Sequence, residues 1–218
     1  DVADAVISNH IATTLGIEWA CKRDELLFRF EIPKEEVRTK RSLLSAVAQC
    51  YDPAGLISFA IIPAKILLQD AFRRKLAWDD PLPPEMLDII EKWIENLHRL
   101  KSVRIPRPYN MAHTSPIRSS QLHMFSDASQ DCYATMGYVR NEHEDGRITC
   151  SLIASKNRLA PLRSNMSIPR MELNGCLISA RLSVLIQREL DINFESVYYW
   201  TDSSAALAFI RNTVTRFS

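Results

Sequence analysis

The sequence predicts an α/β protein in which a β-hairpin and a mainly helical segment precede a segment with the element order βββαβα. Apolar residues recur at helical spacing between residues 37 and 101. Between residues 122 and 155, apolar runs are separated by short polar stretches, which is typical of antiparallel strands. An amphipathic stretch from about residue 170 to 190 is followed by one more apolar run and a final helical pattern.

Length and composition indicate a folded protein. With 218 residues, the chain can form one large domain or two small ones. Hydrophobic residues make up 46% and charged residues 24%, which argues against disorder. No window approaches the roughly 18 consecutive apolar residues of a membrane helix, and the first residues lack the pattern of a signal peptide. We therefore expect an intracellular protein without a membrane partner.

Charge and cysteine usage narrow the function classes. The net charge of +1, from 27 basic and 26 acidic residues, gives the whole molecule little attraction for nucleic acid. Such binding would depend on local basic clusters, which occur at 34–41, 73–75 and 156–170. The cysteines are odd in number, and neither a C-x-x-C nor an H-x-x-x-H pair occurs. Disulfide-stabilised and zinc-dependent classes are therefore disfavoured.

The first half of the chain predicts a hairpin and three helices that prolines end or interrupt. Pro33 follows the hairpin, Asp52-Pro53 ends the first helix, and Pro84 suits the first position of the third. Pro63 predicts a kink or a fresh start within the second helix. The expected elements are strands at 14–19 and 25–32 and helices at 37–51, 54–76 and 85–101. Because residues 104–120 are rich in proline and serine, we place a linker there.

The second half predicts a mixed sheet with two helices. The expected elements are strands at 122–126, 132–140 and 148–155, a helix at 170–190, a strand at 196–201 and a helix at 203–211. The apolar pattern of the long helix predicts an inward face formed by Leu173, Leu177, Ala180, Val184 and Leu185. We also expect Phe125 and Trp200 to be buried.

Three acidic residues stand at element ends that the βββαβα order brings to one edge of the sheet. Asp127 ends the first of these strands, Glu172 lies about one turn into the long helix, and Asp202 follows the fourth strand. Each alone fits a local role, since Asp forms turns and caps and a Glu near a helix N-terminus complements the helix dipole. Converging carboxylates, however, bind hard divalent cations, and two such ions can activate a water and stabilise the leaving oxygen of a phosphodiester.

Several segments together resemble a known family. The order of these segments resembles that of the ribonuclease H domain of reverse transcriptases. Their amino-acid sequences resemble the Pao/BEL class of long-terminal-repeat retrotransposon polyproteins. The matching segments are Lys40-Arg41-Ser42-Leu43-Leu44-Ser45, Tyr51-Asp52-Pro53-Ala54-Gly55-Leu56, Ala64-Lys65-Ile66-Leu67-Leu68-Gln69, Trp78-Asp79-Asp80, Phe125-Ser126-Asp127-Ala128-Ser129, Ser155-Lys156-Asn157-Arg158-Leu159-Ala160-Pro161-Leu162, Ile168-Pro169-Arg170-Met171-Glu172-Leu173 and Trp200-Thr201-Asp202-Ser203. They span nearly the whole chain.

The resemblance implies a domain organisation. Residues 1–33 would be the end of a reverse transcriptase palm, with Leu15-Gly16-Ile17-Glu18-Trp19 as its last strand, and residues 34–103 a helical thumb or connection region. Residues 104–120 would be the linker, and residues 121–218 a ribonuclease H-like domain truncated at its C-terminus. A fourth acidic residue is expected beyond Ser218, which leaves the competence of this piece alone open. The parent polyprotein would be cytoplasmic, in virus-like particles.

The resemblance also implies the reaction. Asp127, Glu172 and Asp202 would be catalytic and would hold two Mg²⁺ ions, with Mn²⁺ as the alternative, to hydrolyse the RNA strand of an RNA/DNA hybrid. The 2′-hydroxyl would distinguish RNA from DNA. The partners would be the hybrid and the remainder of the polyprotein. The candidate nucleic-acid contacts are Ser129, Lys156, Arg158, Arg170, Asn174 and Ser203.

Three other interpretations stay open. A non-catalytic connection module could bind the hybrid or a partner subunit through Arg73, Arg74 and Lys75. Family labels for such segments sometimes invoke an aspartic peptidase, but that class requires Asp-Thr/Ser-Gly, and neither Asp127-Ala128-Ser129 nor Asp202-Ser203-Ser204 supplies the Gly. The chain could also be a degenerate copy of an element without activity.

Overall fold

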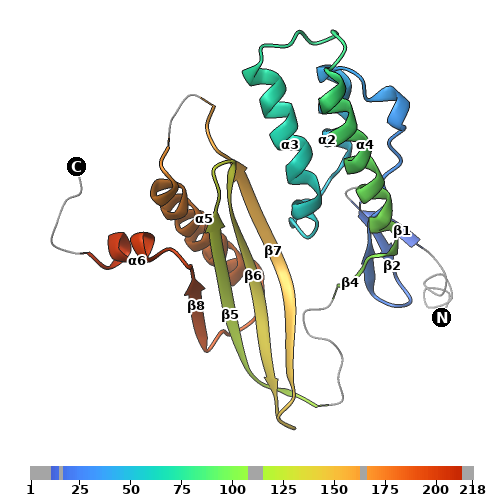
Figure 1. Ribbon diagram of the computed structural model, residues 1–218. Coiled ribbons are helices and arrows are strands. Elements are labelled where there is room, and N and C mark those ends of the chain that lie inside the picture. Colours follow the sequence, from blue (N-terminus) through green and yellow to red (C-terminus); the bar gives the residue numbers. More distant parts are fainter. Residues whose placement is uncertain (1–10, 15–16, 108–114, 163–165, 213–218) are drawn as a thin grey trace. The chain divides into compact units, whose positions relative to one another are not determined.

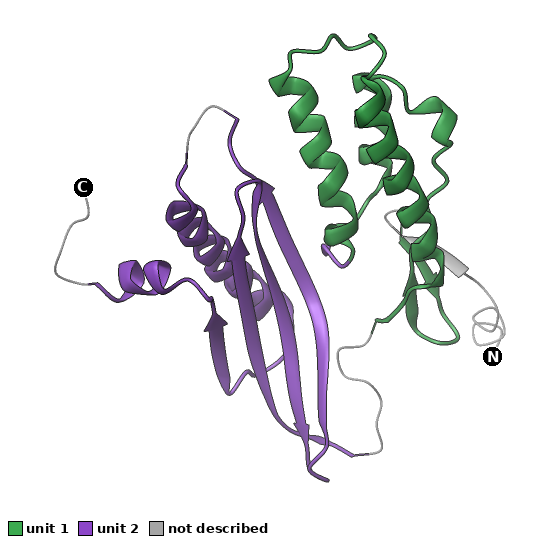
Figure 2. Cartoon of the chain, viewed as in Figure 1, with its two compact units in different colours: residues 1–53, 57–108 green, residues 54–56, 109–218 purple. Residues whose placement is uncertain are grey.

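The chain folds into two compact units. Figure 1 traces it in a computed structural model, which describes residues 11–14, 17–107, 115–162 and 166–212. One unit contains residues 1–53 and 57–108, and the other contains residues 54–56 and 109–218 (Figure 2). The expected α/β class is confirmed. Residues 15–16, the middle of the expected linker, and residues 163–165 of the basic cluster at 156–170 lie outside the described residues.

Unit 1 contains an antiparallel sheet in the order β1-β2-β3-β4. Its strands are β1 (Ile11–Thr14), β2 (Ile17–Ala20), β3 (Glu25–Leu27) and β4 (Arg104–Pro106). The predicted hairpin is present as the β2–β3 pair, with Trp19 opposite Leu26. Two expectations were wrong. The second strand ends at Leu27 rather than at Ile32, although the side chains of Phe28, Phe30 and Ile32 remain buried, and residues 104–106 of the supposed linker pair with β3.

The helices of unit 1 follow the predicted order. They are η1 (Lys34–Glu36), α2 (Lys40–Gln49), α3 (Ser58–Arg73), α4 (Pro84–Arg99) and η2 (Leu100–Ser102). Pro84 occupies the start of α4, as predicted, and α3 continues through Pro63. The buried stripe of α4 consists of Met86, Ile90, Trp93, Ile94 and Leu97. These side chains form the core of the unit with residues of α2 and α3.

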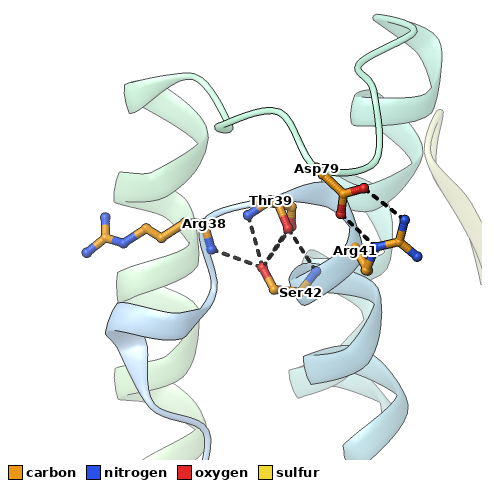
Figure 3. A network of polar contacts seen from close by, with 5 residues as sticks. All are labelled: Arg38, Thr39, Arg41, Ser42 and Asp79. Carbon is orange, nitrogen blue, oxygen red and sulfur yellow. Dashed lines mark hydrogen bonds and ion pairs between the residues drawn. The ribbon is translucent and has the colours of Figure 1, made fainter.

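The start of α2 is fixed by a polar network (Figure 3). Thr39 Oγ1 accepts a hydrogen bond from the Ser42 amide at 3.2 Å, and the Thr39 amide donates to Ser42 Oγ at 2.9 Å, which forms a reciprocal capping box. The Arg41 guanidinium donates to both carboxylate oxygens of Asp79, at 2.7 and 3.0 Å. Two of the segments quoted for the family resemblance, at 40–45 and 78–80, therefore meet in a structural contact.

Unit 2 contains a four-stranded mixed sheet in the order β7-β6-β5-β8. Its strands are β5 (Ile117–Ala128), β6 (Cys132–His143), β7 (Ile148–Leu159) and β8 (Ser196–Trp200). The first three form an antiparallel meander, and β8 pairs with β5 in parallel, ending with Phe125 opposite Trp200. A parallel pair needs a crossover connection, which the long helix α5 (Ile168–Glu189) supplies. Helix α6 (Ser204–Arg211) follows β8.

Helix α5 lies across one face of this sheet (Figure 1), but not with the face that the sequence predicted. Leu173, Leu177, Ala180, Val184 and Leu185 are exposed, and the buried residues are Met171, Glu172, Gly175, Ile178, Ser179, Leu182, Ser183 and Ile186. Small residues recur every four positions on this inner face, which lets the helix backbone approach the sheet closely. Leu182 and Ile186 complete a core with Leu122, Met124 and Val139. Despite the length of α5, no helix in the described part of the chain is long and apolar enough to cross a membrane.

Residues 54–56 belong to unit 2 because they contact its edge strand β7. The Ser155 amide donates to the Ala54 carbonyl at 2.8 Å, and the Ser155 hydroxyl donates to the Gly55 carbonyl at 2.5 Å. Gly55 has a φ of +73°, and a Cβ at this position would lie 2.1 Å from the Ser155 carbonyl oxygen. Glycine is therefore required at position 55 both by the backbone conformation and by the close approach.

Candidate metal centre

Asp127, Glu172 and Asp202 converge at one edge of the unit 2 sheet. One carboxylate oxygen from each residue lies within 4.8 Å of those of the other two. Asp127 is the penultimate residue of β5, Glu172 stands in the first turns of α5, and Asp202 lies between β8 and α6. Three elements that are distant in the sequence thus deliver the three acidic side chains to one place.

Strand pairing and helix packing together explain this convergence. Phe125 and Trp200 are the last partners of the parallel β5–β8 pair, and Asp127 and Asp202 each follow two residues later. Helix α5 reaches them because Gly175 lies against the end of β5, where a Cβ would be 3.4 Å from the Asp127 carbonyl oxygen. Glu172 precedes Gly175 by three residues and therefore shares its helix face.

The electrostatics of the cluster are unfavourable without a cation. Glu172 is only 7% exposed, whereas Asp127 and Asp202 are exposed. Burial raises the pKa of Glu172, and the nearby negative charges of Asp127 and Asp202 raise it further, while the Ala128 backbone N–H partly opposes the rise. Among the described residues, Glu172 Oε2 is one of two buried side-chain atoms, with Ser179 Oγ, that have no hydrogen-bond partner.

The donor set fits a hard divalent cation. Carboxylate oxygens are the ligands that Mg²⁺, Mn²⁺ and Ca²⁺ prefer. A cation beside Glu172 Oε2 would give this buried oxygen a partner and would offset the repulsion among the three acidic groups. The residues that could hold it are Asp127, Glu172 and Asp202. Carboxylates at this spacing could hold metal ions next to a substrate phosphate.

A cleft of about 370 Å³ opens beside the two aspartates. It is lined by Phe125, Ser126, Asp127, Ala134, Thr135, Met136, Trp200, Thr201 and Asp202. Phe125 and Trp200 are 40% and 50% exposed, so the expectation that they are buried was wrong. Their rings stack at a centroid distance of 6.1 Å and an interplanar angle of 12°. The cleft therefore has an aromatic wall next to its acidic end.

Three of the predicted nucleic-acid contacts make local hydrogen bonds. Ser129 Oγ accepts from the amides of Asp131 and Cys132, both at 3.2 Å, and so shapes the β5–β6 turn. Ser203 caps α6 by accepting from the Ala206 amide at 3.1 Å. The Asn174 amide group donates to Met166 Sδ at 3.1 Å. The structure thus gives each of these residues a structural task.

The three predicted basic contacts are all exposed. Lys156 and Arg158 lie on the edge strand β7, and Arg170 lies in the first turn of α5, close in sequence to Glu172. The basic side chains at the end of α3 in unit 1, in contrast, form ion pairs. Arg74 pairs with Asp70 at 2.8 Å and with Glu85 at 2.7 Å. The Arg73 guanidinium lies 3.4 Å from Asp70.

Sequence reasoning did not single out Ser126, Gly175 or Met136. Ser126 contacts the neighbouring strand and helix, Gly175 sets the approach of α5, and Met136 lines the cleft. A small residue one helical turn after Glu172 was a usable signal for Gly175. The signal for Ser126 was its position next to Asp127. Met136 lies on a strand next to β5, and its role depends on pairing that a single sequence does not reveal.

Comparisons with known proteins found a matching family model and similar solved structures. The model of a family described as "Pao retrotransposon-like RNaseH-like domain" matches residues 39–203. A search of the curated proteins finds no match. Two solved structures are similar: a foamy viral protease-reverse transcriptase dRH with double-stranded DNA, at 14% identity and a TM-score of 0.45, and a foamy viral protease-reverse transcriptase with double-stranded DNA, at 18% and 0.46. The similarity covers 93% and 91% of this chain but only 36% and 38% of those chains.

Proposed function

Because the chain belongs to the Pao retrotransposon-like RNaseH-like domain family, we propose that its unit 2 hydrolyses the RNA strand of an RNA/DNA hybrid with the help of divalent cations. The observation that supports this most strongly is the convergence of three carboxylates within 4.8 Å at one edge of the sheet. The buried, unpartnered Oε2 of Glu172 adds to it, since such an atom beside like charges calls for a positive partner.

The three carboxylates would hold Mg²⁺, with Mn²⁺ as the alternative ion. When bound, two such ions lower the pKa of a water and stabilise the leaving oxygen of a phosphodiester. Asp127 and Asp202 are exposed and would face the substrate. Glu172 is buried, so its carboxylate would bind the ion from the protein side and not from the solvent side.

Substrate binding would rest on exposed cations and on the cleft. Lys156, Arg158 and Arg170 would contact backbone phosphates, and ribose 2′-hydroxyls in the minor groove of the hybrid would distinguish the RNA strand. Ser129 and Ser203 would contribute through the turn and the helix cap that they form, and Asn174 through its side chain, which contacts Met166. The proposed partners are therefore the hybrid and the remainder of a retroelement polyprotein.

The wider assignments rest on the family resemblance. Residues 1–33 are proposed as the end of a reverse transcriptase palm, residues 34–103 as a thumb or connection region, and residues 121–218 as the ribonuclease H-like domain. The proposed setting is a cytoplasmic virus-like particle. The non-catalytic alternative is weaker, because Arg73 and Arg74 already pair with acidic residues of their own unit. The peptidase alternative lacks the glycine that its motif requires.

Hybrid cleavage and metal binding test the proposal. The unsubstituted chain, Asp127→Asn and the control Asp131→Asn would be assayed with a labelled RNA/DNA hybrid and Mg²⁺, and titrated with Mn²⁺ by calorimetry. Asp131 is an exposed aspartate in the β5–β6 turn and is not part of the acidic cluster. We expect Asp127→Asn to lower cleavage by about a hundredfold or more and to weaken Mn²⁺ binding, with Asp131→Asn unchanged. Equal Mn²⁺ affinity for all three proteins would refute the metal centre, even if cleavage is too slow to measure.

A further inference from the structure

We propose that Ser126 is a positioning residue for the acidic cluster, and that its hydroxyl holds the three carboxylate-bearing elements at the separation that divalent cations require. This inference rests on the proposed metal-dependent function and deepens it. Ser126 is not a metal ligand in this proposal, because its hydroxyl points to the neighbouring elements and not to a carboxylate. It acts through the backbone and side chains that present the ligands.

One hydroxyl contacts all of the elements concerned. Ser126 precedes Asp127 on β5, and its Oγ donates to the Trp200 carbonyl on β8 at 3.3 Å. The same Oγ lies 3.6 Å from Cys176 Sγ on α5, within hydrogen-bonding distance for sulfur. Trp200 precedes Asp202 by two residues, and Cys176 follows Glu172 by four, which is one helical turn. Each contact therefore lies next to one of the three carboxylates.

This contact lies where the pairing between β5 and β8 ends. Within the described residues, the last β5–β8 partners are Phe125 and Trp200, so both aspartates lie beyond that ladder, although Asp127 still pairs with Ala134 of β6. Like charges that face one another without a cation repel, and the repulsion would separate the strand ends. The Ser126–Trp200 hydrogen bond resists this separation at the first position beyond the ladder.

Substitutions at Ser126 can distinguish the role of its hydroxyl group from the packing of its side-chain carbon. A Cβ at Gly175 would lie 3.7 Å from Ser126 Cβ, so the helix backbone already touches this part of the strand. Alanine at position 126 would keep that Cβ and remove only the oxygen. Threonine would keep the oxygen. The two substitutions therefore separate positioning by the hydroxyl from simple packing.

The experiment compares the full chain with Ser126→Ala, Ser126→Thr and the matched control Ser151→Ala, a half-buried serine on β7. Mn²⁺ affinity is measured by calorimetry. Amide hydrogen exchange at residues 172–176 and 200–203 is measured without metal, and the melting temperature is recorded for each variant. We expect Ser126→Ala to weaken Mn²⁺ binding by about tenfold or more and to speed local exchange, with little change in melting temperature. Ser126→Thr should restore both properties, and Ser151→Ala should change neither.

The outcomes separate this inference from the function on which it rests. If Ser126→Ala matches the unsubstituted chain in both affinity and exchange, the positioning role is wrong. It is also wrong if Ser151→Ala weakens Mn²⁺ binding to the same extent. If the unsubstituted chain binds Mn²⁺ no better than Asp127→Asn does, the metal proposal fails, and the metal-free exchange data alone decide the role of Ser126. Faster exchange at 200–203 then supports it, and unchanged exchange overturns it.

Discussion

Gly175 of α5 lies directly against the backbone of Asp127 on β5, where an added Cβ would stand 3.4 Å from the Asp127 carbonyl oxygen. This contact sets the distance between the helix that carries Glu172 and the strand that carries Asp127. At 3.4 Å a methyl group is in ordinary van der Waals contact, but a branched or longer side chain has no room between the two backbones. The geometry of the acidic cluster therefore depends on a residue that carries no functional group.

Substitutions of different size at Gly175 should show whether the space at this position controls stability and metal binding. Gly175→Ala should be neutral or should stabilise the chain by up to about 1 kcal/mol, because alanine is the better helix former. Gly175→Leu should lower the free energy of unfolding by about 1–3 kcal/mol through overpacking, and should weaken Mn²⁺ binding because Glu172 moves away from Asp127. Urea unfolding and Mn²⁺ calorimetry measure the two effects. A Gly175→Leu protein with full stability and full Mn²⁺ affinity would show that the contact does not set the cluster.

The stability of the metal-free chain should depend on the ionisation of Glu172. Since the pKa of Glu172 is raised in the folded state, the folded chain binds more protons than the unfolded chain between the two pKa values. The free energy of unfolding should therefore fall as the pH rises from about 4.3, the ordinary pKa of a glutamate, through the raised pKa. In Glu172→Gln this part of the decline should disappear.

Urea unfolding at a series of pH values, with a chelator present, measures this dependence. The control is Glu189→Gln, which removes an exposed carboxylate at the end of the same helix. Adding Mn²⁺ at neutral pH should stabilise the unsubstituted chain, because a cation favours the ionised carboxylate. Parallel pH profiles for Glu172→Gln and the unsubstituted chain would contradict the prediction.

The sequence predicted the strands of unit 2, the order of the helices and the positions of the acidic residues because these depend on local signals. Asp127 and Asp202 each end an apolar run, and such an end is visible without any knowledge of the fold. The orientation of α5 was not predictable in the same way. Large apolar residues occur on both faces of this helix, so the hydrophobic pattern does not decide between them. The face that packs on the sheet is the one that also carries Gly175, Ser179 and Ser183, whose small side chains allow a close approach.

The aromatic wall of the cleft was misjudged for a related reason. Phe125 and Trp200 are strand residues with large apolar rings, which normally predict burial. Alternation along β5 places Met124 under α5 and Phe125 on the opposite face of the sheet. Which face a helix covers is a property of the three-dimensional arrangement. The same pattern in sequence is therefore compatible with either a buried ring or a cleft wall.

Hybrid binding should depend on the exposed cations of β7 and not on Arg73 and Arg74 at the C-terminal end of α3. The double variant Lys156→Ala/Arg158→Ala should weaken binding of an RNA/DNA hybrid and should lower the slope of log affinity against log salt by about 1 to 2. Arg73→Ala/Arg74→Ala should leave both unchanged, because those guanidinium groups pair with Asp70 and Glu85.

Fluorescence anisotropy at several salt concentrations, in a chelating buffer that prevents cleavage, measures both quantities. The paired variants remove the same amount of charge, so a difference between them reports position and not net charge. A larger loss for the α3 variant than for the β7 variant would favour the connection-module interpretation over the one proposed here.

Two glycines with positive φ offer a matched test of the contact between residues 54–56 and β7. Gly146, with a φ of +81°, has no heavy atom within 4 Å of an added Cβ, whereas a Cβ at Gly55 would collide with the Ser155 carbonyl oxygen. Gly146→Ala should therefore lower the free energy of unfolding by only about 1–2 kcal/mol, the strain of a left-handed backbone conformation. Gly55→Ala should lower it by that amount and by a further contribution, either from overpacking or from loss of the hydrogen bonds from Ser155. Urea unfolding of both variants compares them, and equal losses would mean that the contact with β7 contributes nothing to stability.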